Sequence, residues 1–141
     1  MKRAFTLVEL LVVVIIVGIL AGLGYSSYRG ALGKGHSAEA KANLAVLRQL
    51  ERSYYVENND VYVAMNNGTG DTLNAGLPLS PAACDYVCND PNYYFEYLCD
   101  TTGSCSACRC TTGGKPSPVS GNYTLSLTPG GTFSCSSGTC P

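Results

Sequence analysis

A long apolar segment close to the amino terminus constrains this chain more than any other feature of its sequence. No residue of Leu10–Gly24 has a polar side chain, and Glu9 is the only charged residue between positions 4 and 28. Lys2 and Arg3 precede the segment, and by the positive-inside rule they keep the amino end in the cytoplasm. The segment therefore predicts a helix that crosses a membrane or is buried inside an assembly.

The composition favours a membrane or extracellular protein over a cytosolic enzyme. Charged residues make up 13% of the chain, whereas they make up about 25% of an ordinary soluble domain. Residues 29–52 hold five basic and two acidic residues, and residues 53–141 hold two basic and seven acidic residues. A surface that binds nucleic acid is basic, so the acidic carboxyl-terminal part argues against such a partner. We find no phosphate loop and no nucleophile with a base, and we predict neither enzymatic activity nor a cofactor.

All the cysteines lie in the carboxyl-terminal part of the chain. The eight are Cys84, Cys88, Cys99, Cys105, Cys108, Cys110, Cys135 and Cys140. An even number at close spacing is typical of a disulfide framework in an oxidising compartment. The segment CSACRC offers a metal site as an alternative, but zinc sites usually combine C-x-x-C units or add histidines. The only histidine, His36, is distant in sequence and is interpreted as a solvated surface residue. We predict disulfides and no metal.

Two interpretations of the amino terminus compete. In the first, it is an ordinary signal peptide that is cut near Ala21–Gly24 and releases a secreted, cysteine-rich binding module. In the second, only a short basic leader is removed and the apolar segment is retained. Glu9 favours the second interpretation, because an acidic residue at the edge of the apolar core weakens insertion and has no use in a discarded peptide.

The stretch RAFTLVELLVVVIIVGILA resembles the amino terminus of type IV pilins and of the pseudopilins of type II secretion. In that family a short basic leader precedes Phe-Thr-Leu-x-Glu and a long hydrophobic helix. The resemblance implies a cut between Ala4 and Phe5 and N-methylation of Phe5, although the family usually has glycine at the position of Ala4. It also implies that Glu9 pairs with the Phe5 amine of a neighbouring subunit during assembly, since opposite charges in a low dielectric relieve one another.

The same resemblance implies what the protein does. It predicts a structural subunit of a type IV pilus-like extracellular filament that polymerises through its hydrophobic helix, with a minor pilin or a type II secretion pseudopilin as the alternative. The expected partners are copies of the same chain, the prepilin peptidase and the pilus assembly machinery. The precursor is expected in the inner membrane and the mature subunit in a filament at the cell surface.

The apolar segment continues into an amphipathic one. Four apolar residues recur there at a spacing of three or four, namely Leu44, Leu47, Leu50 and Tyr54, which predicts one helix face. We therefore predict a leader (residues 1–4) followed by one helix (residues 5–58), whose hydrophobic part (residues 5–28) we name the stem. Six glycines between Gly18 and Gly35 indicate either close packing of helices or local unwinding.

Residues 59–141 predict a small, disulfide-rich head. NYYFEYLC (residues 92–99) has the composition of a strand, and NYTLSLT and TFSCS around PGG have the pattern of a hairpin. Residues 61–91 and 104–121 are expected to be loops. The predicted fold class is α+β: a long N-terminal helix packed on a small antiparallel sheet, as in the type IV pilin fold. The resemblance further implies a Cys135–Cys140 disulfide and leaves the other six cysteines unassigned.

Overall fold

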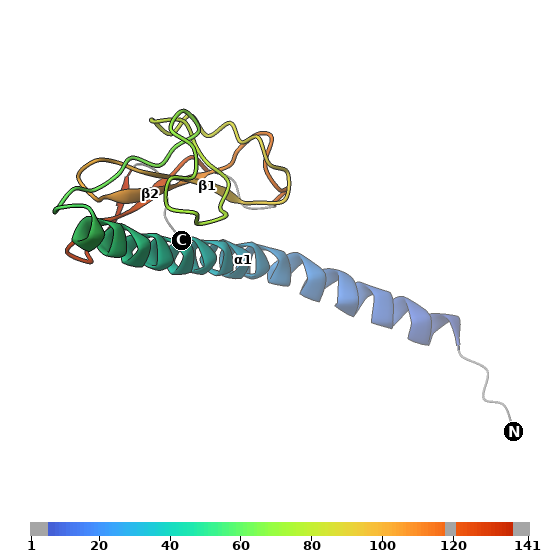
Figure 1. Ribbon diagram of the computed structural model, residues 1–141. Coiled ribbons are helices and arrows are strands. Elements are labelled where there is room, and N and C mark those ends of the chain that lie inside the picture. The colour runs from blue at the N-terminus through green and yellow to red at the C-terminus, as the bar shows by residue number, and fades with distance from the viewer. Residues whose placement is uncertain (1–5, 118–120, 137–141) are drawn as a thin grey trace, which may run out of the picture.

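One helix and one sheet make up the regular structure of the described residues. The computed structural model describes residues 6–117 and 121–136. The elements are α1 (Leu7–Glu57), β1 (Phe95–Cys99), β2 (Cys105–Arg109), β3 (Thr124–Leu127) and β4 (Phe133–Ser136). The strands form an antiparallel sheet in the order β1-β2-β3-β4. The head lies along the second half of α1, and the first half projects away from it (Figure 1). The predicted α+β fold is confirmed.

α1 is continuous from Leu7 to Glu57 and passes through every glycine of its first half. Its end is marked by Asn58, whose backbone N–H donates to the Tyr54 carbonyl at 2.9 Å. A β-carbon added at Gly18, Gly22 or Gly24 would meet nothing within 4 Å. Contacts among the described residues therefore do not require these glycines, which is what close packing against another molecule predicts.

The predicted apolar stripe of α1 packs on the sheet. Leu44 and Leu47 are fully buried, and Leu50 and Tyr54 are half-buried against the same cluster. The sheet contributes Phe95, Tyr97, Ala107, Leu125 and Leu127 from its inner face, and Tyr123, directly before β3, joins the same cluster. The antiparallel register of β3 and β4 confirms the predicted hairpin. The hairpin was predictable because both the alternation of its residues and its turn are local signals.

The interpretation of residues 104–121 as a loop is wrong for its first part. β2 is an inner strand of the sheet and pairs with β1 on one side and β3 on the other. Its sequence CSACR has none of the β-branched or aromatic residues that usually mark a strand. Its backbone pairs with strands on both sides, and disulfides join Cys105 to Cys99 and Cys108 to Cys84. Tertiary pairing overrides local propensity here.

His36 is half-buried rather than fully solvated. Its ring stacks on Tyr94 with the ring centroids 3.7 Å apart, and its Nδ1 lies 3.5 Å from the Ser117 hydroxyl. Burial, and then the nearby charge of Arg109, lower the pKa of His36. The histidine therefore links α1 to the residue directly before β1 and to the loop that follows β2.

Candidate assembly site

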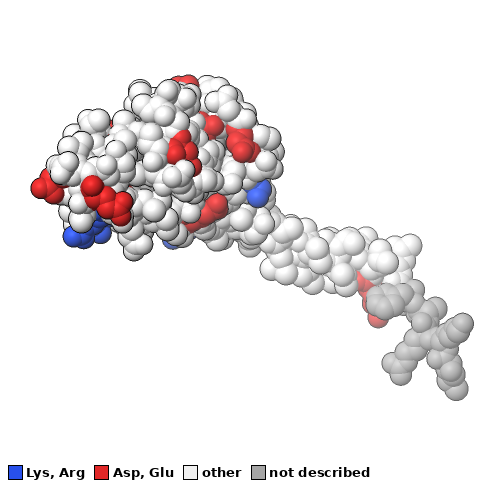
Figure 2. Space-filling model, viewed as in Figure 1, with Lys and Arg blue, Asp and Glu red and all other residues white. Residues whose placement is uncertain are grey.

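The stem has an exposed apolar surface along its described length. Leu7 and Leu23 expose 81% and 71% of their surface, and the other large hydrophobic side chains between them expose at least 46%. The buried positions of α1 begin only at Gly33. Figure 2 shows that the charged residues gather on the head and that the visible stem is uncharged up to its far end. An apolar surface of this size marks a site of contact with a membrane or with other chains.

The helix is also suited to a bilayer by its dimensions. α1 is the helix of the described chain that is long and apolar enough to cross a membrane, by length and composition. Twenty helical residues rise about 30 Å, which is the thickness of the hydrocarbon layer. The helical part of the stem (residues 7–28) reaches this length before the head begins.

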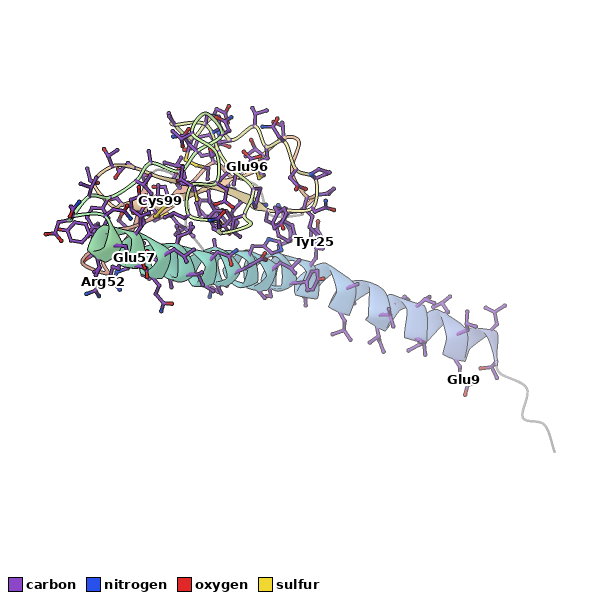
Figure 3. All side chains as sticks on the ribbon, in the orientation of Figure 1. Glu9, Tyr25, Arg52, Glu57, Glu96 and Cys99 are labelled. Carbon is purple, nitrogen blue, oxygen red and sulfur yellow. A yellow bond between two sulfur atoms is a disulfide. The ribbon has the colours of Figure 1, made fainter. Side chains whose placement is uncertain are left out.

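Glu9 lies in the first turn of α1, at the end far from the head (Figure 3). The Thr6 backbone N–H and hydroxyl donate to Glu9 Oε2 at 2.9 and 2.8 Å, and the Glu9 backbone N–H donates to Thr6 Oγ1 at 3.3 Å. These reciprocal bonds form a capping box. The carboxylate is exposed and borders a groove lined by Val8, Val12 and Val13. It is thus held in a fixed position beside apolar side chains.

This cap gives Glu9 a role within its own chain besides the predicted contact with a neighbour. The pattern Thr-x-x-Glu before an apolar run is a sequence signature of a helix start, so Thr6 could have been identified from the sequence. The predicted processing residues Ala4 and Phe5 lie outside the described residues. The structure therefore describes the acid of the predicted pair and not the amine.

The cysteines of the head form disulfides across distant parts of the sequence. The bridges are Cys84–Cys108, Cys88–Cys110 and Cys99–Cys105, with Cα–Cα distances of 5.5, 5.4 and 4.0 Å. The three cysteines of CSACRC therefore belong to three different bridges, which leaves none of their thiols for a metal. Cys135 on β4 is disulfide-bonded. Cys140, its predicted partner, lies outside the described residues, and this pairing stays a prediction.

Removing a disulfide is expected to destabilise the head according to the length of the loop that it closes. Cys88→Ala with Cys110→Ala should lower the free energy of unfolding by about 3 kcal/mol, and Cys99→Ala with Cys105→Ala by about 2 kcal/mol. The sequence separations are 22 and 6 residues, and the longer loop restricts the unfolded chain more. Urea denaturation of the full chain in mild detergent measures both values. A larger loss for the short loop would contradict this order.

Three charged side chains of the described head and helix are buried. The sequence analysis did not identify them as buried residues. Glu51, Glu96 and Arg109 expose 1%, 1% and 2% of their surface. Glu96 Oε1 accepts the Asn89 backbone N–H at 2.6 Å, and burial raises its pKa. Arg109 Nη1 donates to the Tyr94 carbonyl at 3.1 Å, and burial lowers its pKa. All three therefore lie where ionisation is opposed by loss of water.

Comparison with known proteins agrees with this arrangement. Residues 1–25 match the family model described as the prokaryotic N-terminal methylation motif. The chain is similar to the type IV major pilin protein PilA of Myxococcus xanthus (strain DK1622), with 37% identity over 69 residues, which are 49% of the chain and 31% of that protein. It is also similar to the type II secretion system core protein G of Escherichia coli (strain K12), with 31% identity over 103 residues, which are 73% of the chain and 68% of that protein. No solved structure matches the chain.

The methylation motif, the exposed apolar half of α1 and the small antiparallel head define a class of proteins built as a helical stem with a head. The chain belongs to the family of type IV pilins and type II secretion pseudopilins. It spans less than a third of the Myxococcus protein that it matches, and about two thirds of the Escherichia coli protein. The predicted family is thus confirmed.

Proposed function

We propose that this protein is a structural subunit of a type IV pilus-like extracellular filament. The observation that carries the proposal is the exposure of the apolar stem outside the head, because such a surface is stable in a bilayer or against other stems and not in water. The family is structural rather than enzymatic, and its members assemble with copies of themselves. Before assembly the stem lies in the inner membrane, and in the filament it packs among the stems of other subunits.

The proposed assembly step brings Glu9 of one subunit to the amino end of another. A cut between Ala4 and Phe5 creates a free amine on Phe5, next to the apolar stem. Buried alone, this amine or the Glu9 carboxylate would be costly, and paired each relieves the other. The capping box supports this role because it fixes the position of the carboxylate at the helix start. Glu9 then sets the depth to which an arriving stem inserts.

A type II secretion pseudopilin is the second candidate, because the similarity to core protein G spans 73% of the chain and that to PilA spans 49%. Electron microscopy with an antibody against the head separates the candidates. Labelled surface filaments with this chain as the dominant protein would support the proposal, and traces of it in filaments of another protein would indicate a minor pilin. Unlabelled surface filaments combined with a loss of protein secretion on deletion of the gene would favour the pseudopilin.

The size of the residue at position 4 is expected to control processing. Ala4→Leu should leave most of the chain as precursor in the membrane, since a bulky side chain next to the cut prevents its entry into the peptidase. Ala4→Gly is the matched control and should be processed at least as well as the native chain. Mass spectrometry of the membrane fraction measures the loss of residues 1–4. An amino terminus near Gly22 in the native protein would instead indicate signal peptidase and a secreted module.

A further inference from the structure

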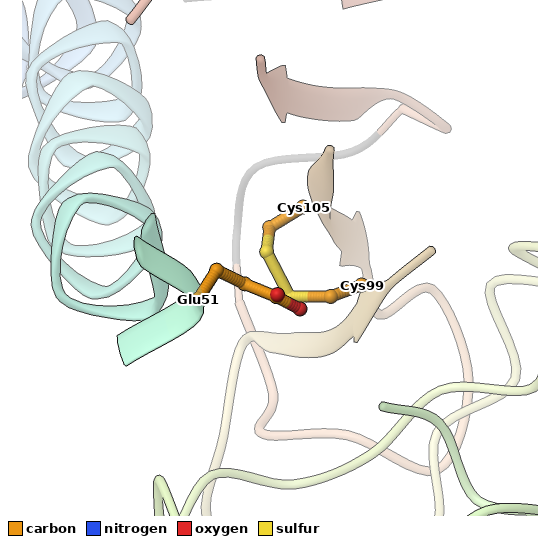
Figure 4. A group of neighbouring side chains, drawn as sticks. All are labelled: Glu51, Cys99 and Cys105. Carbon is orange, nitrogen blue, oxygen red and sulfur yellow. A yellow bond between two sulfur atoms is a disulfide. The ribbon is translucent and has the colours of Figure 1, made fainter. Parts of the chain in front are cut away.

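Glu51 and the Cys99–Cys105 disulfide meet where α1 packs on the turn between β1 and β2. Figure 4 shows the Glu51 side chain pointing from α1 toward the disulfide, and a carboxylate oxygen and both sulfur atoms lie within 4.8 Å of one another. All three residues are at most 1% exposed. Cys99 and Cys105 are paired residues of β1 and β2, so the sheet fixes the disulfide opposite the helix.

The Glu51 carboxylate lacks the hydrogen bonds that would stabilise its charge. Oε2 accepts one long bond, from the Val63 backbone N–H at 3.4 Å. Oε1 is buried and has no hydrogen-bond partner in the described subunit. The charged group that acts on Glu51 from another element is Asp100, directly after β1, which repels it. The pKa of Glu51 is raised to about 7, mainly by burial and to a smaller extent by this repulsion. The neighbouring disulfide has no proton to donate to the unpaired oxygen.

We propose that Glu51 and the Cys99–Cys105 disulfide form a proton-coupled thiol–disulfide site, in which reduction by a dithiol releases the proton of Glu51. The Cys99–Cys105 S–S bond breaks and an S–S bond forms in the reductant. Two electrons and the two thiol protons pass from the reductant to the sulfur atoms of Cys99 and Cys105. One of the new S–H groups donates to Glu51 Oε1, and Glu51 gives its own proton to solvent because its carboxylate is now hydrogen-bonded.

The coupling has a definite sign. In the oxidised head Glu51 is a neutral acid below about pH 7, and in the reduced head it is a carboxylate down to a lower pH. Each reduction between these two pKa values releases one proton, so higher pH favours the reduced form by up to about tenfold per pH unit. The disulfide is therefore held more firmly in acid than at neutral pH.

An exchange equilibrium tests this coupling. The full chain in mild detergent is equilibrated with reduced and oxidised dithiothreitol at about pH 6 and about pH 8, starting from both redox states. Differential alkylation and mass spectrometry of the Cys99 and Cys105 peptides measure the exchange constant of this disulfide alone. We expect the constant to rise about fivefold to tenfold between the two pH values. In Glu51→Gln the exchange constant should be the same at both pH values. In Glu57→Gln, whose side chain is exposed on the same helix, it should rise with pH as in the native protein.

Two further measurements keep the result interpretable. Near-ultraviolet circular dichroism should show that the reduced head keeps its tyrosine packing, and infrared difference spectra of the native protein at about pH 6 should show one protonated carboxyl group lost on reduction. This second measurement also serves if Glu51→Gln does not fold. An exchange constant that is equal at both pH values would overturn the proposal. So would a pH dependence that persists in Glu51→Gln, or a head that unfolds on reduction, because then no thiol is held beside Oε1.

Discussion

Glu9→Gln is expected to reduce filament yield at least about 100-fold while leaving membrane insertion unchanged. The expectation rests on the proposed pair between the Glu9 carboxylate and the Phe5 amine of the next subunit. Removing one member of a buried charge pair costs about 3–5 kcal/mol, because the other charge is left without a partner. Each 1.4 kcal/mol is a factor of ten in an equilibrium constant. The neutral amide inserts into a membrane at least as readily as the carboxylate.

Glutamine at position 9 separates charge from helix capping. Its side-chain oxygen can still accept the Thr6 backbone N–H, so α1 keeps its capping box. Thr6→Ala is the matched control: it removes the hydroxyl that bonds both Glu9 groups and keeps the Glu9 charge. It should destabilise the helix start by about 1 kcal/mol and lower filament yield much less than Glu9→Gln does. Immunoblots of sheared filaments and of membranes measure both variants. Normal yield from Glu9→Gln, or equal losses in both variants, would limit Glu9 to capping.

The parts of the fold that were predicted correctly depend on signals within a few residues. The stripe from Leu44 to Tyr54 has the helical period, and its burial follows from one apolar face. β3 and β4 alternate around a turn whose geometry is set by its own residues. The stem was recognisable because a long apolar run that directly follows a single acidic residue is compatible with few structures other than a helix in a membrane or in an assembly.

The features that were missed depend on contacts between distant residues. β2 has no strand composition and is defined by its two neighbours in the sheet. The partners in the Cys84–Cys108 and Cys88–Cys110 disulfides are 24 and 22 residues apart in sequence. Because eight cysteines allow 105 pairings, the sequence did not identify these partners. Glu51 carried a usable signal, since it lies four residues after Leu47 on the buried face of α1. Its disulfide neighbour could not be read from that spacing.

Glu51→Gln is expected to remove a large part of the pH dependence of head stability. Burial raises the pKa of Glu51 from its ordinary value of 4.5 to about 7, and a difference of this size between folded and unfolded chains corresponds to about 3 kcal/mol. Because the folded pKa is the higher one, the stability linked to this proton is fully present below about pH 4.5. It is lost as the pH rises through about 7.

The informative quantity is the free energy of unfolding of the native protein minus that of Glu51→Gln, measured by urea denaturation of the full chain in detergent. This difference should fall by about 3 kcal/mol between about pH 4 and about pH 8. Glu96, whose pKa burial also raises, titrates in both proteins and cancels from the difference. Any cost of burying the amide cancels too, because it does not depend on pH.

Glu57→Gln, changed at an exposed position of α1, should follow the native protein at both pH values. If the free energy of unfolding varied with pH in the same way in the native protein and in Glu51→Gln, the buried carboxyl would keep its ordinary pKa. Water would then reach it, or the head would relax around its charge.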